Sequence, residues 1–269
     1  MPKNALGIIL FLIFLAGVFF LLSIYQKNKP KILRVSPAIK ETAEGKIKYP
    51  QDYTFVFVGD SMTEKLGNFD ELREYLQNYY PDKTFEILNY GFGSTNILSV
   101  YNRLVKETVY GRKFRPVLDI EFDIIFIESF GNNPLSQFPL NEGLKKQTEA
   151  LDKITSEIKK SNPKAKIVFV STISPNSKTF ALGQLELTDE KRLEWVMERK
   201  AYLKNHIDYA RTKNIPVIDI YNKSLNEDGD GNIEFIDSSD NIHPSPSGVY
   251  FISREIADFI YNQKLLGSD

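Results

Sequence analysis

Five short apolar runs, separated by longer amphipathic stretches, constrain the fold of this chain more than any other feature of its sequence. The runs occupy residues 53–58, 84–90, 123–129, 166–171 and 216–220. They are dominated by Phe, Ile and Val and do not alternate with polar residues. This composition is typical of strands in a parallel sheet, because helices bury both faces of such strands. The runs therefore predict a mostly parallel five-stranded sheet.

The stretches between the runs have the periodicity of helices. In one, Leu144, Leu151, Ile154 and Ile158 fall on one helical face, and the pattern stops at Pro163. A second predicted helix carries six apolar residues at helical spacing: Leu193, Val196, Met197, Leu203, Ile207 and Ala210. A last helix is predicted to start at the Ser-Pro pair 245–246. Strands that alternate with helices predict a doubly wound, three-layer α/β/α sandwich.

Composition narrows the classes of function. The chain has 269 residues, 34 Lys+Arg against 35 Asp+Glu, and no Cys. The balanced charge gives no sign of a nucleic-acid partner, which would require a basic surface. The absence of Cys excludes disulfides, thiolate catalysis and Cys-ligated zinc. We therefore expect one ordinary α/β domain with an additional N-terminal segment.

The first 25 residues predict a membrane anchor. Residues 5–22 form an apolar run long enough to cross a bilayer, and 4–26 carry no charge. A cleaved signal peptide is the alternative, but no Ala-x-Ala pattern follows the run. Residues 26–51, rich in Lys and Pro, are predicted to be a tether, and 52–269 the folded domain.

Two features of the sequence give opposite answers about the side of the membrane on which the domain lies. Positive charges lie on both flanks of the apolar run, with more of them after it, and a simple count would place the domain in the cytoplasm. A very short N-terminal tail before one apolar helix is instead the usual layout of an exported domain. We therefore expect a membrane-anchored protein with its domain outside the cytoplasm.

Four short motifs follow predicted strands or precede the last helix. They are Gly-Asp-Ser-Met-Thr at 59–63, Asn-Tyr-Gly-Phe-Gly-Ser-Thr at 89–95, Glu-Ser-Phe-Gly-Asn-Asn at 128–133 and Asp-Asn-Ile-His-Pro at 240–244. Ligands of such sheets bind beyond the carboxyl ends of the strands. In this order the motifs resemble the SGNH/GDSL hydrolase superfamily, over about residues 52–264. The resemblance implies a flavodoxin-like SGNH hydrolase fold and a serine esterase.

The chemistry of such an enzyme requires an activated serine. A serine hydroxyl becomes nucleophilic when a neighbouring base takes its proton, so Ser61 is the candidate nucleophile and His243 the candidate base. Asp240 precedes His243 by three residues and can orient its ring, although Asp237 is an alternative. The other histidine, His206, is predicted to lie on the surface of a helix, off its apolar stripe.

The resemblance also implies an oxyanion hole. Its donors would be the backbone N–H groups of Ser61 and Gly93 and the side-chain amide of Asn133. The second motif has its glycine one residue early, which leaves the Ser94 N–H as an alternative to Gly93. The third motif reads Gly-Asn-Asn-Pro where the family usually has Gly-x-Asn-Asp, so Asn132 is an alternative to Asn133.

Residues 226–237 resemble a twelve-residue calcium loop of the EF-hand type. The predicted oxygen ligands are Asn226, Asp228, Asp230, Asn232 and Asp237. The chemistry itself requires no cofactor, but a structural calcium ion here could fix the loop that carries Asp240 and His243. The alternative is a solvated Asp/Gly turn.

The sequence thus predicts a Ser-His-Asp hydrolase that cleaves carboxylic esters through an acyl-enzyme. A membrane anchor suggests a substrate in the cell envelope, such as an O-acetylated glycan or a lipid ester. The loop 173–187, with Phe180 and Leu182, is expected to line the acyl side. An O-acyltransferase with the same triad, and an inactive glycan-binding module, are the alternative functions.

Overall fold

The computed structural model describes residues 40–42 and 45–267. The chain divides into two units, Met1–Pro37 and Ala38–Asp269, and the described residues all belong to the second. The predicted anchor, 1–25, and the first part of the predicted tether lie outside the described residues. Among the helices that are described, none combines the length and the apolar character needed to cross a membrane.

The sheet of the described unit has five parallel strands. In spatial order they are β4 (Phe85–Gly91), β3 (Tyr53–Gly59), β7 (Ile124–Glu128), β8 (Lys166–Val170) and β9 (Val217–Ile218). The five predicted strands are therefore confirmed. When the five strands are numbered by their position in the chain, their spatial order in the sheet is 2-1-3-4-5, which is the order of flavodoxin-like sheets.

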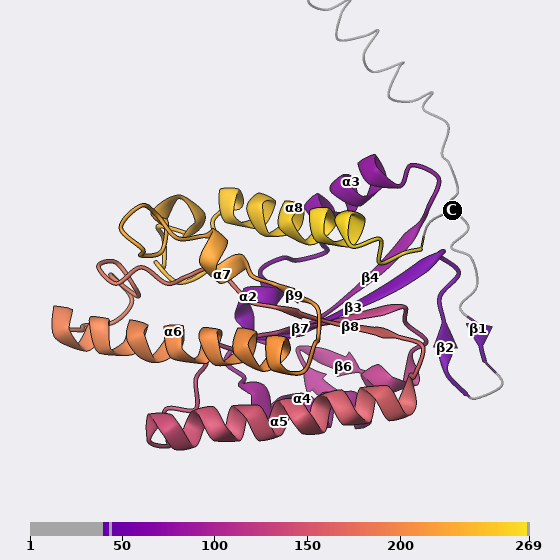
Figure 1. Cartoon of the computed structure of the whole chain (residues 1–269), viewed down its shortest axis with the longest axis horizontal. Helices are drawn as coiled ribbons and strands as arrows, with labels where there is room; N and C mark the ends of the chain where they lie inside the picture. The colour runs from indigo at the N-terminus through magenta and orange to yellow at the C-terminus, as the bar shows by residue number, and fades with distance from the viewer. Residues whose placement is uncertain (1–39, 43–44, 268–269) are drawn as a thin grey trace, which may run out of the picture. The chain divides into compact units, whose positions relative to one another are not determined.

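Helices cover both faces of this sheet (Figure 1). On one side lie α3 (Asp70–Tyr79) and α8 (Pro246–Asn262), and on the other α4 (Val100–Val105), α5 (Leu140–Ser161) and α6 (Asp189–Thr212). The predicted three-layer α/β/α sandwich is confirmed.

The side chains of β3 show how the two cores form. Phe55 and Phe57 belong to the apolar cluster packed by α3 and α8, whereas Val56 and Val58 belong to the cluster packed by α4, α5 and α6. Because successive side chains of a strand point to opposite faces, a run without polar residues fills both cores. Phe57 stacks on Phe126 of β7 with 4.2 Å between ring centroids.

Short elements complete the described unit. They are β1 (Lys40–Glu41), β2 (Ile47–Lys48), α2 (Ser61–Glu64), η1 (Ile97–Ser99), β5 (Thr108–Tyr110), β6 (Arg112–Phe114), η2 (Val117–Asp119), α7 (Ile220–Lys223) and η3 (Ile233–Phe235). The β1–β2 pair differs from the predicted tether. The backbone oxygen of Ile47 accepts the N–H of Glu121 at 2.8 Å, and Tyr49 packs against the core. The later part of the predicted tether thus belongs to the folded unit.

Helix α6 corrects two predictions. Leu193 and Met197 of the predicted apolar stripe are 48% and 56% exposed. His206, predicted to lie on the surface, is completely buried, and its ring stacks on Phe169 of β8 with 4.4 Å between centroids. His206 lies one helical turn after the buried Leu203, which places it on the face that meets the sheet.

Candidate active site

Ser61 stands at the turn between β3 and α2. The side chain of Asp60 caps the short helix, because its Oδ1 accepts the backbone N–H of Met62 at 2.8 Å. Asp60 is fully buried, whereas Ser61 is partly exposed. The turn therefore holds the hydroxyl of Ser61 at the carboxyl end of the sheet, where parallel sheets bind their ligands.

Two glycines allow this turn to pack closely on the sheet. A Cβ atom at Gly59 would lie 1.9 Å from Thr63 Oγ1, and one at Gly91 would lie 2.3 Å from the backbone nitrogen of Glu64. Neither distance is compatible with a side chain. The glycines that end β3 and β4 are thus required for α2 to sit directly against both strands.

Gly93, the predicted oxyanion donor, lies beside the nucleophile turn, since a Cβ atom added to it would be 3.5 Å from Ser61 Cβ. Its N–H already has two acceptors, Glu64 Oε2 at 3.0 Å and Tyr110 Oη at 2.9 Å. Tyr110 Oη is also within 3.0 Å of both carboxylate oxygens of Glu64. The negative charge of the Glu64 carboxylate beside the Gly93 N–H would repel the negative oxygen of a tetrahedral intermediate. The alternative donor, Ser94, has a left-handed backbone with φ of 57°.

Sequence reasoning missed both Glu64 and Tyr110. Glu64 follows Ser61 by three residues on the same helical turn, and that spacing was a usable signal. Tyr110 lies on β5, and nothing in its sequence context points to the nucleophile.

Of the two asparagines in the third motif, Asn133 faces the nucleophile turn. Its Nδ2 donates to Asp60 Oδ2 at 2.8 Å. Asn132 is also buried, but its side-chain amide has no hydrogen-bond partner within the described residues. One Nδ2 hydrogen of Asn133 is therefore fixed by Asp60, which leaves the second for another acceptor.

Asp240 and His243 form a close pair on the loop before α8. Asp240 Oδ2 lies 2.7 Å from His243 Nδ1, and each side chain is 20% exposed. Asp240 Oδ1 accepts the backbone N–H groups of Ile242 at 2.8 Å and of His243 at 2.9 Å. Burial acts to raise the pKa of Asp240, but the hydrogen bonds from His243 and Ile242 outweigh it and hold that pKa below its usual value. Asp240 is therefore an ionised acceptor for the imidazole N–H.

Asp237, the alternative acid, does not contact the imidazole ring. Its Oδ1 accepts the backbone N–H of Ser239 at 2.8 Å, and its backbone N–H donates to the carbonyl of His243 at 2.8 Å. Asp237 thus shapes the loop, while Asp240 contacts the ring.

His243 is near the nucleophile turn. Burial raises the pKa of Asp60, and the charge of His243 is among the effects that oppose this rise. Within the described residues, neither Ser61 Oγ nor His243 Nε2 carries a hydrogen bond, so the predicted contact between these two atoms is not made in the structure. The structure thus pairs Asp240 with His243 and gathers Gly93 and Asn133 around the turn of Ser61.

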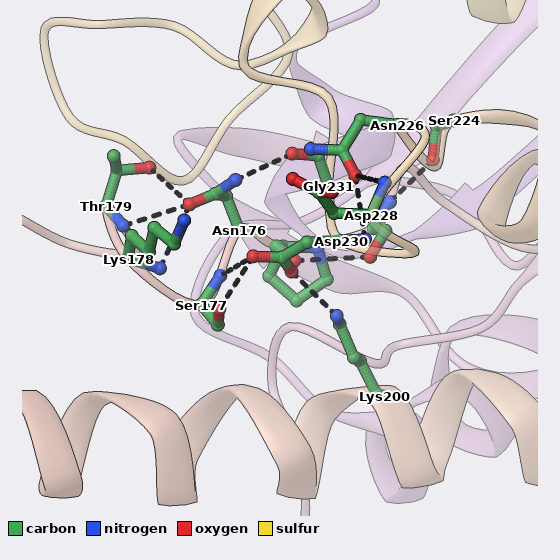
Figure 2. Close-up of polar contacts among 12 residues, drawn as sticks. Asn176, Ser177, Lys178, Thr179, Lys200, Ser224, Asn226, Asp228, Asp230 and Gly231 are labelled. Atoms are coloured by element: carbon green, nitrogen blue, oxygen red, sulfur yellow. Dashed lines mark hydrogen bonds and ion pairs between the residues drawn. The ribbon is translucent and has the colours of Figure 1, made fainter.

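The predicted calcium loop is held by protein groups instead (Figure 2). Asp230 Oδ1 pairs with Lys200 Nζ at 2.8 Å, and its Oδ2 accepts the Ser177 N–H at 2.8 Å and hydroxyl at 2.6 Å. Asn226 Oδ1 accepts the backbone N–H groups of Asp228 and Asp230, both at 3.0 Å.

Two of the other predicted ligands, Asn232 and Asp237, also accept backbone N–H groups, whereas the side chain of Asp228 is exposed. Asn232 Oδ1 accepts the Glu234 N–H at 3.0 Å, and the Asp237 carboxylate accepts Ser239 N–H. In the described part of the chain, no three His, Asp or Glu side chains are grouped so that they could hold a metal ion. A calcium ion in this loop would have to compete with Lys200 for the carboxylate of Asp230, and the calcium site stays a prediction.

The loop after β8 is hydrogen-bonded to the loop that carries Asp240 and His243. The backbone N–H of Ala181 donates to the carbonyl of Asn241 at 3.2 Å, and Asn241 Nδ2 donates to the carbonyl of Leu182 at 3.1 Å. Phe180, predicted to line the acyl side, is buried in a cluster with Ile242, whereas Leu182 is 50% exposed. Phe180 therefore packs with Ile242 and supports the loop that carries His243.

A partly exposed serine at the end of the first sheet strand, together with an ionised aspartate paired to a histidine before the last helix, is the layout of a flavodoxin-like ester hydrolase. The chain belongs to the GDSL-like Lipase/Acylhydrolase family, whose family model matches residues 57–249.

One curated protein and several solved structures are similar to this chain. The Bacillus subtilis protein YpmR is 22% identical over 257 residues, which cover 87% of this chain and 93% of YpmR. A catalytic mutant of Axe2, an acetylxylan esterase from Geobacillus stearothermophilus, has a similar fold, with a TM-score of 0.53, 15% identity and coverage of 78% of this chain and 94% of that one. A GDSL-like lipase from Bacteroides thetaiotaomicron gives a TM-score of 0.52 at 13% identity, with coverage of 80% and 88%.

Proposed function

We propose that this chain is a serine esterase in which Ser61, His243 and Asp240 form the catalytic triad. The observation that carries the proposal is the 2.7 Å contact between Asp240 and the Nδ1 of His243. This contact fixes the tautomer in which Nε2 can accept a proton, which is the role of the acid in a triad. Membership of a family of ester hydrolases supports the reaction class.

In the proposed reaction, His243 Nε2 takes the proton of Ser61 Oγ as this oxygen attacks the ester carbonyl. The resulting oxyanion accepts hydrogen bonds from Asn133 Nδ2 and from the N–H groups of Ser61 and Gly93. Collapse of the intermediate breaks the ester C–O bond, and the imidazolium gives its proton to the leaving alkoxide. Water, activated by the same imidazole, then releases the acid from the acyl-enzyme.

We propose an acetyl group on an envelope glycan as the substrate. Two proteins of similar fold are acetylxylan esterases, which supports a short acyl group on a sugar. A cavity of about 20 Å³ beneath Met62 and Thr63 has room for about one water molecule. A larger cavity of about 620 Å³ is lined by Asp123 and Lys166, at the opposite ends of the strands from Ser61.

We also propose that residues 1–25 anchor the protein in a membrane and that the domain faces the outside of the cytoplasm. The apolar run at 5–22 supports the anchor. Protease treatment of intact cells would test the orientation, because a domain outside the cytoplasm would be digested while a cytoplasmic control protein is not.

The esterase proposal is tested with the full chain in detergent. Hydrolysis of p-nitrophenyl acetate, butyrate and octanoate is measured for the wild type, Ser61→Ala and the control Ser161→Ala at the end of α5. We expect the acetate to react fastest, Ser61→Ala to lose activity and the control to keep it. Mass spectrometry after treatment with a fluorophosphonate should find the adduct on Ser61.

Equal rates for the wild type and Ser61→Ala would refute the triad. If the acyl-enzyme forms but water does not release it, a sugar acceptor should restore turnover, and the protein would be an O-acyltransferase. Failure of the fluorophosphonate to label a folded protein would leave glycan binding as the function to examine.

A further inference from the structure

A second carboxyl group lies directly behind the nucleophile turn. Glu128, the last residue of β7, is 5% exposed and Asp60 is completely buried. Glu128 Oε2 accepts the backbone N–H of Asp60 at 2.9 Å, and each of the two carboxyl groups influences the pKa of the other. The proposed triad assigns no role to Glu128.

The surroundings of Glu128 hold it in one orientation. Its Oε1 accepts the hydroxyl of Ser129 at 2.8 Å and the backbone N–H of Phe130 at 2.7 Å. Phe130 has a left-handed backbone, with φ of 55°, at the start of the loop that carries Asn133. Glu128 thus contacts both the turn of Ser61 and the loop of Asn133.

Two carboxyl groups in contact inside a protein cannot both be ionised cheaply. A guanidinium lies near them, that of Arg103, which is 2% exposed. Its hydrogen bonds go to neutral oxygens: the carbonyls of Gly59 and Tyr90 and the hydroxyls of Thr95 and Ser99. The carboxyl pair therefore has no direct ion pair with this guanidinium.

Burial and the proximity of a second carboxyl group both favour a pair that retains one proton. Burial, with the neighbouring Asp60, raises the pKa of Glu128 well above its usual value. Burial lowers the pKa of Arg103 to about 10, against the opposing charges of Asp60 and Glu128, so the guanidinium stays charged at neutral pH. The other titratable groups that act on Asp60 are Arg199 of α6 and His243.

We propose that Glu128 is a positioning residue of the esterase, which shares one proton with Asp60 and thereby fixes the carboxylate that orients Ser61 and Asn133. Asp60 caps the helix of Ser61 through Oδ1 and holds Asn133 Nδ2 through Oδ2. Any rotation of Asp60 would therefore move the nucleophile and an oxyanion donor together. The inference rests on the proposed triad, but the shared proton can be measured without activity.

The first test compares Glu128→Gln with Glu128→Ala in the full chain. Gln mimics the protonated acid in part, because its oxygen can accept from Ser129 and Phe130 while its amide donates to the Asp60 carboxylate. The amide cannot accept the Asp60 N–H, so only the acceptor that Glu128 Oε2 provides for this group is lost. We expect Glu128→Gln to keep kcat within about 10-fold of the wild type and Glu128→Ala to lose about 100-fold or more, with KM changed less than about 3-fold.

Asp123→Asn is the matched control. Asp123 precedes β7, and its carboxylate accepts the backbone N–H of Thr54 in β3 at 2.7 Å, so it joins the same two strands at their other end. This variant should hydrolyse p-nitrophenyl acetate like the wild type. Equal loss in Glu128→Gln and Glu128→Ala would overturn the proposal, because Glu128 would then be needed as a carboxylate. Full activity of Glu128→Ala would overturn it as well.

The second test is infrared spectroscopy at neutral pH. The wild type should show the carbonyl stretch of a protonated carboxylic acid that is missing from Glu128→Gln, and the absence of this difference would overturn the shared proton. The measurement stands even if Glu128→Ala fails to fold. If the spectra differ but the wild type does not hydrolyse esters, the proton is retained and the proposed function alone fails.

Discussion

Asp240 holds His243 with both of its carboxylate oxygens. Oδ2 lies 2.7 Å from the ring Nδ1, and Oδ1 accepts the backbone N–H of the same histidine at 2.9 Å. A spacing of three residues makes this double contact possible within one turn of chain. The acid therefore fixes the backbone and the ring of His243 together.

Replacing Asp240 by Asn should lower kcat by about 10³–10⁴-fold, because the amide would stabilise the wrong tautomer of His243. KM should change less than about 3-fold, since Asp240 does not bind substrate. The control is Asp237→Asn, which alters a carboxylate on the same loop that is hydrogen-bonded to Ser239. A larger loss in Asp237→Asn than in Asp240→Asn would assign the triad acid to Asp237.

The sequence was sufficient for the features that depend on local spacing. The five strands are continuous apolar runs, and the helix α8 begins at the predicted Ser245, whose hydroxyl accepts the Gly248 N–H at 3.0 Å. The contact of Asp240 with His243 follows from three residues of separation. The last predicted strand is shorter than expected because Asp219 caps helix α7, which begins at Ile220.

Features that depend on contacts between distant residues were not predictable. Glu128 is 68 positions from Asp60, and no sequence pattern shows that the two carboxyl groups meet. The oxygen-rich loop at 226–237 has a calcium-like pattern, but Lys200, which takes the key carboxylate, comes from α6. The prediction that His206 lies on the surface was wrong because the apolar stripe was defined partly by Leu193 and Met197, which are exposed. A stripe that includes exposed residues does not identify the buried face of the helix.

Glu64→Gln should raise kcat/KM by roughly tenfold, because it removes a negative charge from the N–H of Gly93 that would serve the oxyanion. Glu74→Gln, at an exposed position of α3, is the control and should leave the rate unchanged. The measurement is hydrolysis of p-nitrophenyl acetate at neutral pH. A fall in the rate of Glu64→Gln would instead show that the carboxylate helps to bind substrate.

His206 should make the protein sensitive to acid. Burial lowers the pKa of His206 to about 3, below its ordinary 6.5. Below pH 6.5 the unfolded chain binds a proton at His206 that the folded chain does not bind. The contribution of His206 to the free energy of unfolding is therefore fully present above pH 6.5 and is lost as the pH falls below this value. At about pH 4.5 the buried His206 should lower the free energy of unfolding by about 3 kcal/mol relative to its value at neutral pH.

The variant His206→Leu should remove that loss, since an apolar side chain can occupy the same buried place. Urea unfolding at neutral and acid pH gives the free energies for both proteins. An equal loss on acidification in the wild type and in His206→Leu would show that other groups cause the acid sensitivity.

Calcium should not stabilise the protein, because the oxygens of Asn226 and Asp230 are already occupied by protein donors. Thermal unfolding of the full chain with millimolar calcium and with EDTA should give the same Tm within error. A clear rise in Tm with calcium, lost in Asp228→Asn, would restore the loop as a calcium site.

Lys200→Met should destabilise the protein by about 3 kcal/mol, because it leaves the carboxylate of Asp230 without its cation in a nearly closed site. The two side chains are only 11% and 16% exposed, and they join α6 to the segment that leads to Asp240 and His243. The matched control, Lys191→Met, breaks the pair with Glu194 on the same helix, whose side chains are 48% and 67% exposed. Solvent already screens that pair, so its loss should cost less than about 0.5 kcal/mol. Urea unfolding of both variants at neutral pH gives the comparison, and equal costs would mean that burial does not strengthen the Lys200–Asp230 contact.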